Sequence, residues 1–358
     1  MGMIKNNSVS RRELLTGLAA AGAGALLSSV RLRAQAPGGA TRRLDLHHHF
    51  ANPALVKLMA EKKMSGWQTW TPYSPAKAIE DMDKGGVQAS MISITTPGIW
   101  FGSAAETRRL AREINEYGAK MVSDYPGRFG LFAVLPFPNA NDCLKEIEYA
   151  FDTLKADGIG MQTSYDQLWL GDPAFAPLWQ ELDRRKAVVY VHPTDAPCSV
   201  GLSYMAAPVL GSFIEWPMNS ARTMFSLMLN QVPRRFPNIR FIFAHSGGTM
   251  PLLIGRIQGM AQNSRPDFPA KVRATFPDGV AAEYAKFYFD TAQGFAKVNF
   301  DAMRALVPDS HILFGSDYPF FPISAAVDGL SKLDLPADLL RAIERGNTET
   351  LLASARSG

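Results

Sequence analysis

The strongest constraint on the fold is a regular alternation of short apolar segments with longer helical segments. Eight segments rich in branched and aromatic side chains are predicted as strands: 44–50, 87–95, 129–135, 158–163, 187–192, 240–245, 287–291 and 311–316. Segments with helical periodicity separate them: 53–63, 74–84, 104–125, 141–156, 173–186, 212–231, 249–262 and 297–306, and two helical stretches close the chain near Ser354. Strands that are apolar throughout are typical of a parallel sheet covered by helices. The pattern predicts an α/β fold, a single (β/α)8 barrel.

A doubly wound open sheet is the alternative architecture. No glycine-rich phosphate-binding motif follows the first strand and the sequence has no P-loop, so the barrel is favoured. The chain has 358 residues, and removal of an N-terminal export segment leaves about 320, enough for one barrel. No internal repeat or low-complexity linker divides residues 37–358, which we predict to be one domain.

The N-terminal segment has the features of a secretion signal. A Ser-Arg-Arg-Glu-Leu-Leu sequence at 10–15 leads into an apolar run at 14–30, and Ala34-Gln35-Ala36 provides a small-residue cleavage site. This arrangement resembles a twin-arginine signal that spans residues 1–36 and directs the protein to the periplasm. A membrane anchor is the alternative, but the run is short for a span of about 20 residues, so no stable anchor is expected.

Charge and cysteine content exclude several functional classes. The formal net charge of +4 comes from residues 1–36, where five basic residues face one acidic residue, so the remainder is neutral. We therefore expect no nucleic-acid partner. Cys143 and Cys198 are too few for a disulfide-rich scaffold and are expected to be free, partly buried thiols.

Polar side chains gather where the predicted strands end. Five of the six histidines close a strand: His47, His48, His49, His192 and His245; Asp317 follows the eighth strand. In a parallel barrel the carboxyl ends of all strands open on one face, which is where active sites lie. Residues two apart on a strand share a face, so His47 and His49 should point the same way. His311 begins the eighth strand and is expected to be structural, on the opposite face.

Each of these residues also has an ordinary explanation. The histidine triplet could be a solvated cluster, His192 a satisfied strand-end histidine, His245 a helix cap, and Asp317 an N-cap or turn residue. Considered together, several imidazoles and one carboxylate suit a divalent transition metal better than Ca²⁺ or Mg²⁺. We expect one such ion, with zinc as the first choice and manganese as the second.

Four motifs carry a resemblance to a known family. They are His47-x-His49, Val191-His192-Pro193, Ala244-His245-Ser246-Gly247-Gly248 and Gly315-Ser316-Asp317-Tyr318-Pro319. Together they resemble the motif set of the amidohydrolase superfamily, in the branch of aminocarboxymuconate-semialdehyde decarboxylase, along residues 44–352. Shorter segments at 95–98, 115–117, 126–130 and 184–189 are similar to 6-methylsalicylate decarboxylases.

The resemblance implies specific roles for the site residues. His47, His49, His192 and Asp317 correspond to metal ligands, and His245 to a nearby acid/base group. Members with two metals usually carry a bridging Lys or Glu at the end of the fourth strand, and residues 160–163 offer neither, so one metal is expected. A homodimer is also consistent with the resemblance.

The expected reaction is non-oxidative decarboxylation of a small aromatic or unsaturated carboxylic acid, such as a 2-hydroxybenzoate. Asp317 would donate a proton to the ring carbon that bears the carboxylate, and His245 would tune or relay it. The aromatic side chains expected to wall the ring are Trp100, Trp216 and Phe320, and Arg222 is expected to hold a carboxylate or a phenolate. For all four the alternative is packing or surface charge.

Two other functions remain open from the sequence. The same metal could activate water for hydrolysis of a lactone or amide, with Asp317 or His245 taking the proton. The chain could also be a catalytically inactive periplasmic barrel or binding protein. Release of CO2 distinguishes decarboxylation from hydrolysis, and a stoichiometric transition metal argues against an inactive barrel.

Overall fold

The computed structural model describes residues 42–64, 67–70, 72–199 and 211–356, which include one eight-stranded parallel sheet. The strands are β1 (Arg43–His49), β2 (Val87–Ser93), β3 (Phe129–Val134), β4 (Gly158–Gln162), β7 (Val188–His192), β8 (Arg240–Phe243), β9 (Tyr288–Asp290) and β10 (Ile312–Leu313). They pair in that order, and every pairing is parallel. The predicted signal at residues 1–36 lies outside the described residues.

Backbone contacts between the two ends of the sheet bring it close to a complete barrel. The amide of Leu46 donates to the carbonyl of Phe314 at 2.9 Å, and the amide of His49 donates to that of Tyr318 at 2.7 Å. A parallel bridge between His48 and Tyr318 lies at the same place. The (β/α)8 barrel predicted from the sequence is thus confirmed.

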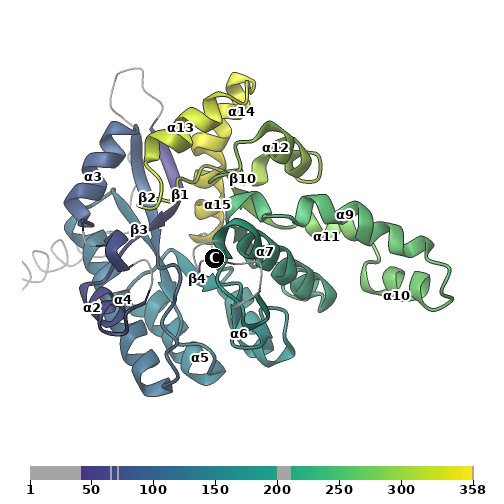
Figure 1. Cartoon of the computed structure of the whole chain (residues 1–358), viewed down its shortest axis with the longest axis horizontal. Helices are drawn as coiled ribbons and strands as arrows, with labels where there is room; N and C mark the ends of the chain where they lie inside the picture. The colour runs from purple at the N-terminus through teal and green to yellow at the C-terminus, as the bar shows by residue number, and fades with distance from the viewer. Residues whose placement is uncertain (1–41, 65–66, 71, 200–210, 357–358) are drawn as a thin grey trace, which may run out of the picture. The chain divides into compact units, whose positions relative to one another are not determined.

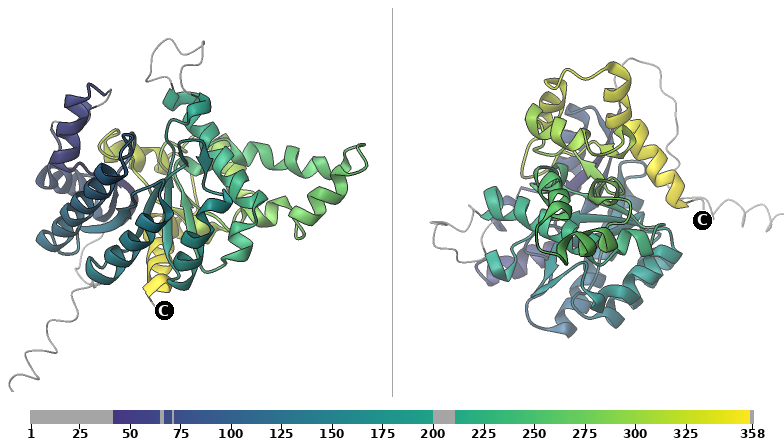
Figure 2. Two further views of the ribbon diagram at one scale, coloured as in Figure 1. Left: turned by 90° about the horizontal axis from the view of Figure 1, so that it is seen from below. Right: turned by 90° about the vertical axis from the view of Figure 1, so that its right-hand side faces the viewer.

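Helices surround the strands (Figures 1 and 2). They are α2 (Pro53–Glu61), α3 (Pro75–Lys84), α4 (Ala104–Asp124), α5 (Ala140–Glu148), α6 (Ala176–Arg184), α7 (Gly211–Leu229), α8 (Val232–Arg235), α9 (Met250–Gly259), α10 (Phe268–Thr275), α11 (Val280–Tyr284), α12 (Lys297–Arg304), α13 (Ile323–Ser331), α14 (Ala337–Arg341) and α15 (Asn347–Arg356). Their apolar faces pack on the outside of the barrel in one large buried cluster. Among the described helices, none is both long and apolar enough to span a membrane.

Local sequence signals explain where several helices begin and end. The hydroxyl of Ser74 accepts a hydrogen bond from the amide of Lys77 at 3.1 Å, and Pro75 occupies the first turn, so α3 begins where the sequence predicts. Gly85 caps the other end, and Gly86 continues with a φ of 65°.

The structure corrects some predicted bounds. The strand predicted at 240–245 ends at Phe243, because His245 and Ser246 adopt left-handed backbone conformations with φ of 57° and 54°. The strand predicted at 311–316 is reduced to Ile312–Leu313. The helix predicted at 141–156 ends at Glu148 and continues as a π-helical turn, Tyr149–Thr153.

Several elements were not predicted. A small antiparallel hairpin follows β4 and consists of β5 (Ser164–Tyr165) and β6 (Leu168–Trp169). Helix α8 follows α7, and helices α10 and α11 lie between α9 and β9, in segments for which no helix is predicted from the sequence.

Both cysteines are free, but they differ in exposure. Cys143 is buried on α5, whereas Cys198 is exposed, so the expectation of two partly buried thiols is wrong for Cys198. His311 behaves as predicted: it lies just before β10, its Nδ1 is 3.1 Å from the carbonyl of Phe287, and its ring stacks on Tyr288 at 3.9 Å.

Candidate metal centre

Three imidazoles and one carboxylate meet at the carboxyl-terminal mouth of the barrel. His47 and His49 come from β1, His192 ends β7, and Asp317 follows β10. One donor atom from each lies within 4.8 Å of all the others. The Nε2 atoms of His47 and His49 are 3.0 Å apart, and each lies 3.2 Å from Oδ1 of Asp317. Donors bound at about 2.0–2.2 Å to one ion are separated by about 3.0–3.5 Å, so these distances fit a single small cation.

The burial of the four side chains supports the same interpretation. His47 and His49 are fully buried, and His192 and Asp317 are only 2% and 6% exposed. Among the described residues, Nε2 of His192 has no hydrogen-bond partner. A buried polar atom without a partner is costly, and coordination of a cation would satisfy it. The donor set therefore fits a divalent transition metal.

Each imidazole is held by a contact at its other nitrogen. Nδ1 of His49 lies 3.3 Å from the carbonyl of Ser93, and Nδ1 of His192 lies 2.8 Å from that of Pro193. A proton on Nδ1 satisfies these carbonyls and leaves the Nε2 lone pair directed at the shared centre. The rings are thus oriented for metal binding by the protein itself.

The third orienting group is Asp290, at the end of β9, and sequence reasoning missed it. Its Oδ2 lies 3.0 Å from Nδ1 of His47 and accepts a hydrogen bond from the Tyr190 hydroxyl at 3.0 Å. Its Oδ1 accepts from the amides of His245 at 3.1 Å and Ala292 at 3.0 Å. The signal was present, because Asp290 is a carboxylate at the end of a predicted strand, the same rule that identified Asp317.

The pKa shifts at the centre favour neutral imidazoles at His49 and His192 and a positive charge at His47. Burial lowers the pKa of His49 to about 4, and burial with three neighbouring imidazoles lowers the pKa of His192 well below its usual value. For His47, burial acts in the same direction, but the carboxylates of Asp290 and Asp317 outweigh it and raise the pKa to about 10. A divalent cation would supply the positive charge that these two carboxylates favour.

Asp317 also faces His245, which the sequence analysis placed near the metal. Nε2 of His245 lies 3.4 Å from Oδ2 of Asp317, while Oδ1 of Asp317 faces His47 and His49. Burial opposes ionisation of Asp317, but His47, His245 and His49 hold its pKa well below the usual range. The His245 side chain is 17% exposed and is the more accessible member of the pair. The carboxylate therefore connects the metal ligands to a partly exposed histidine.

Two of the predicted aromatic residues lie against the metal ligands. The ring of Phe320 is 5.9 Å from the ring of His49, and the indole of Trp216 is 5.9 Å from the ring of His192. Trp216 also donates from Nε1 to Asp195 at 2.7 Å, which fixes its orientation. These positions are consistent with a role of Phe320 and Trp216 as walls of a substrate site. Both rings also pack against histidines of the metal centre.

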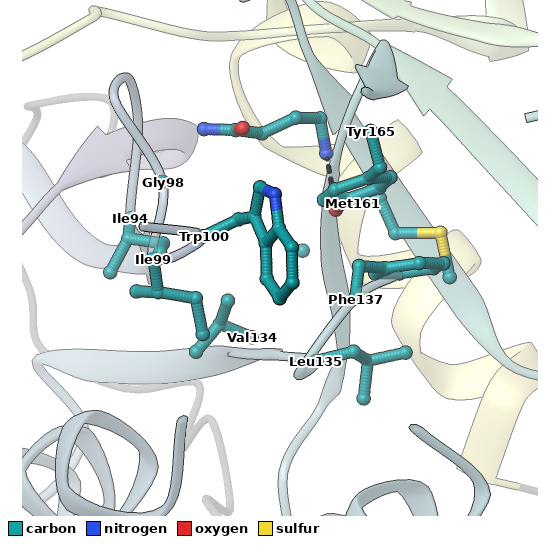
Figure 3. A pocket seen from close by; sticks show the side chains of 11 residues that line it. Ile94, Gly98, Ile99, Trp100, Val134, Leu135, Phe137, Met161 and Tyr165 are labelled. Atoms are coloured by element: carbon teal, nitrogen blue, oxygen red, sulfur yellow. Dashed lines mark hydrogen bonds between the residues drawn. The ribbon is translucent and has the colours of Figure 1, made fainter. Parts of the chain in front are cut away.

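The other two residues predicted to contact the substrate, Trp100 and Arg222, have different surroundings. Trp100 lines an apolar pocket at the ends of β2, β3 and β4 (Figure 3). Arg222 lies on α7, where its guanidinium donates to Glu215 at 3.2 Å and Asn219 at 2.5 Å, and its side chain is 39% exposed. The contacts of Arg222 are with its own helix, and its predicted role in binding substrate stays a prediction.

Comparison with known proteins agrees with this fold and site. The family model described as "Amidohydrolase" matches residues 44–353. The chain is 35% identical over 297 residues to the decarboxylase yanB of Aspergillus niger, covering 79% of this chain and 78% of that protein. It is 33% identical over 318 residues to 6-methylsalicylic acid decarboxylase of Penicillium expansum, covering 85% of this chain and 94% of that protein.

A solved structure has the same fold. It is the dihydroxybenzoic acid decarboxylase from Polaromonas sp. JS666, with bound manganese and the inhibitor 2-nitroresorcinol. The TM-score is 0.77 at 21% identity, and the match covers 87% of this chain and 97% of that one. The chain therefore belongs to the amidohydrolase family, and relatives that it matches over most of their length are decarboxylases of that family.

Proposed function

We propose that the chain is a metal-dependent carboxy-lyase that removes CO2 from a small aromatic acid with a hydroxyl beside the carboxylate, such as a 2-hydroxybenzoate. The observation that carries the proposal is the double role of Asp317. One of its oxygens faces two metal-ligating imidazoles, and the other faces a histidine outside the donor set. Decarboxylation by this route uses a cation to hold the acid and a proton donor beside the ring carbon, and Asp317 lies between the groups that would supply them.

The residues that would hold the ion are His47, His49, His192 and Asp317. A bound zinc or manganese ion would bind the carboxylate and hydroxyl oxygens of the acid and stabilise negative charge on them. Nitrogen-rich donor sets suit zinc, which is our first choice, and manganese is the alternative supported by the solved relative.

The proton transfer falls to His245 and Asp317. Nε2 of His245 lies 3.4 Å from Oδ2 of Asp317, so His245 would relay a proton to Asp317, and Asp317 would deliver it to the ring carbon that bears the carboxylate. That carbon becomes tetrahedral, the bond to the carboxylate carbon breaks, its electron pair returns to the ring, and CO2 leaves. Phe320 and Trp216 would position the ring and limit access of water to the developing charge.

The direct test is incubation of the metal-loaded protein with a panel of 2-hydroxybenzoates, with CO2 and the phenol product measured together. Equimolar release of both is expected, and Asp317→Asn should abolish it. The matched control is Asp328→Asn on α13, an exposed position outside the site. Cleavage of lactones or amides without CO2 would replace this proposal with hydrolysis. Failure of the pure protein to retain a stoichiometric transition metal would favour an inactive barrel.

Export and assembly are part of the same proposal. The twin-arginine sequence and the cleavage site at Ala36 support delivery to the periplasm. Fractionation of cells should find the protein in the periplasm, and replacement of Arg11 and Arg12 by Lys should retain it in the cytoplasm. Arg31→Lys is the control outside the motif, and light scattering tests the homodimer.

A further inference from the structure

A small pocket lies beside the metal centre, at the ends of β2, β3 and β4 (Figure 3). Most of the side chains that line it are apolar, among them Ile94, Val134 and Met161. Figure 3 shows the Trp100 indole in the middle of the lining group. The mechanism described above uses no residue of this pocket.

The chain connects the pocket directly to two metal ligands. Ile94 lies between Ser93 and Thr95. The carbonyl of Ser93 is 3.3 Å from Nδ1 of His49, and the hydroxyl of Thr95 is 3.1 Å from Nδ1 of His192. The wall of the pocket is therefore one residue away from groups that contact the ligands, so an acid held at the metal has this pocket beside it.

The lining also contains two polar residues, and the first of them, Gln162, offers a free donor. It is the last residue of β4 and pairs in register with His192 of β7, so both side chains project from the same face of the sheet. Gln162 is 9% exposed, and its Nε2 has no hydrogen-bond partner among the described residues. A buried amide donor without a partner indicates that an acceptor on a ligand completes its hydrogen bonding.

The second polar residue, Tyr165, supplies another donor. Its hydroxyl accepts a hydrogen bond from the backbone amide of Gln162 at 2.9 Å, which is the dashed line in Figure 3. Burial raises the pKa of Tyr165, so the hydroxyl keeps its proton. That proton has no acceptor among the described residues, and it is available to a molecule in the pocket.

The room and the donors together restrict the occupant. The pocket has room for one molecule slightly larger than a water. A water that accepts from Gln162 and Tyr165 must also place its own hydrogens, and the side chains of Ile94, Val134 and Met161 offer them no strong acceptor. A methyl group would leave both donors without a partner. CO2 has no net dipole, carries an acceptor oxygen at each end and has no hydrogen, so it suits both the apolar wall and the two donors.

We propose that this pocket receives CO2 as it leaves the substrate and, in the reverse direction, holds CO2 for attack by the phenol. The CO2 oxygens would accept from Nε2 of Gln162 and from the Tyr165 hydroxyl. In the reverse direction the ring carbon bonds to the CO2 carbon, one C=O electron pair moves onto oxygen to form the carboxylate, and the ring proton passes to Asp317. The inference rests on the proposed function and adds a binding site for the second product.

The test is carboxylation of the phenol product by the metal-loaded protein in isotopically labelled bicarbonate, with carbonic anhydrase present to keep CO2 and bicarbonate in equilibrium. Labelled acid is measured while CO2 and the phenol are varied separately. Val134→Ile adds one methyl group to the wall and should raise the KM for CO2 by about tenfold, with the KM for the phenol unchanged. Gln162→Met keeps the length of the side chain but lacks the donor, and should raise the KM for CO2 by about two- to tenfold.

Two matched variants are the controls. Val87→Ile adds the same methyl group to a valine that is 2% exposed at the start of β2, at the other end of the barrel. Gln88→Met removes an amide whose Oε1 accepts from Arg345 at 2.8 Å, outside the pocket. Both controls should retain the KM for CO2. Thermal unfolding of each variant checks that it is folded.

Binding of CO2 can also be measured without turnover. The metal-loaded protein, equilibrated with CO2 in the absence of the phenol, should give an infrared band for bound CO2 that is displaced from the band of dissolved CO2. Val134→Ile should lose this band, and Val87→Ile should keep it.

The outcomes separate the proposed function from the CO2 pocket. If no 2-hydroxybenzoate releases CO2, the proposed function fails. If the acid is decarboxylated but the wild-type protein gives no infrared band, or Val134→Ile leaves the KM for CO2 unchanged, the CO2 pocket is overturned and the decarboxylase stands. A rise in the KM for the phenol alone would assign the pocket to the aromatic ring and overturn it as well. An unchanged KM for CO2 in Gln162→Met would overturn the role of its amide.

Discussion

The Nδ1 atom of His47 lies 3.0 Å from Oδ2 of Asp290, and both side chains are fully buried. The contact links β1 to β9 across the inside of the barrel. The same carboxylate accepts hydrogen bonds from the Tyr190 hydroxyl and from the backbone amide of His245, so one residue contacts both a metal-site histidine and the segment that follows β8. A carboxylate behind a histidine ligand fixes the tautomer of the ring and increases its basicity.

Asp290→Asn should therefore weaken metal binding. The amide can still contact His47, but it carries no charge to favour a cation at the ring. A loss of about 10- to 100-fold in metal affinity is expected, measured by competition with a coloured chelator. Asp301→Asn, which changes an exposed aspartate on α12, is the control and should bind metal normally. Equal affinities for the two variants would contradict the orienting role of Asp290.

His245→Asn should separate metal binding from catalysis. His245 is outside the four-residue donor set, so the variant should retain a full equivalent of metal by elemental analysis. It lacks the imidazole that lies 3.4 Å from Oδ2 of Asp317, and kcat should fall about 100- to 10,000-fold if that imidazole relays the proton. Metal loss in step with activity would instead make His245 a ligand, and unchanged activity would remove it from the proton transfer.

The barrel and most of the metal centre can be predicted from the sequence for a simple reason. Parallel barrel strands are apolar on both faces, so they stand out as runs, and any polar group at their carboxyl ends must meet the others at one mouth. That rule predicts His47, His49, His192 and Asp317 as site residues from the sequence alone. It failed at the ends of elements, because the left-handed backbone of His245 depends on contacts made across the barrel.

Other features depend on packing that a single sequence does not encode. Asp290 carries the same sequence signal as Asp317, a carboxylate near the carboxyl end of a predicted strand, but its contact with His47 depends on how β1 and β9 pack. The pocket lined by Trp100 lies between the ends of three strands, and most of its other lining residues are far from Trp100 in the sequence, so the sequence could not predict what surrounds this side chain. Arg222 was selected for its charge, and the structure places its contacts within α7.

A buried hydrogen bond links Asp45 of β1 to Ser316, which follows β10. It should contribute measurably to the free energy of unfolding. The Ser316 hydroxyl donates to Oδ2 of Asp45 at 2.6 Å and accepts from the amide of Tyr318 at 3.2 Å. Ser316→Ala leaves a buried carboxylate short of one donor and should lower the free energy of unfolding by about 2 kcal/mol in denaturant titrations.

The control for that measurement is Ser331→Ala at the end of α13. Its hydroxyl donates to the carbonyl of Asp328 at 2.8 Å in an exposed position, and its removal should change the free energy of unfolding by less than about 0.5 kcal/mol. Equal free energies of unfolding for Ser316→Ala and Ser331→Ala would show that the hydrogen bond between Ser316 and Asp45 does not stabilise the fold.

Gly98 and Gly102 provide a matched pair for the pocket. Both have positive φ, 71° and 89°, so alanine at either position strains the backbone by about 1–2 kcal/mol. They differ in surroundings: a Cβ on Gly98 would lie 2.7 Å from Oε1 and 2.9 Å from Nε2 of Gln162, whereas a Cβ on Gly102 meets nothing within 4 Å. Both variants should therefore lose similar backbone stability in denaturant. Only Gly98→Ala should also raise KM for the aromatic acid, because its Cβ displaces the side chain of Gln162, the last residue of β4, which pairs in register with His192 of the metal centre. An equal KM for the two variants would show that the position of the Gln162 side chain does not matter for binding.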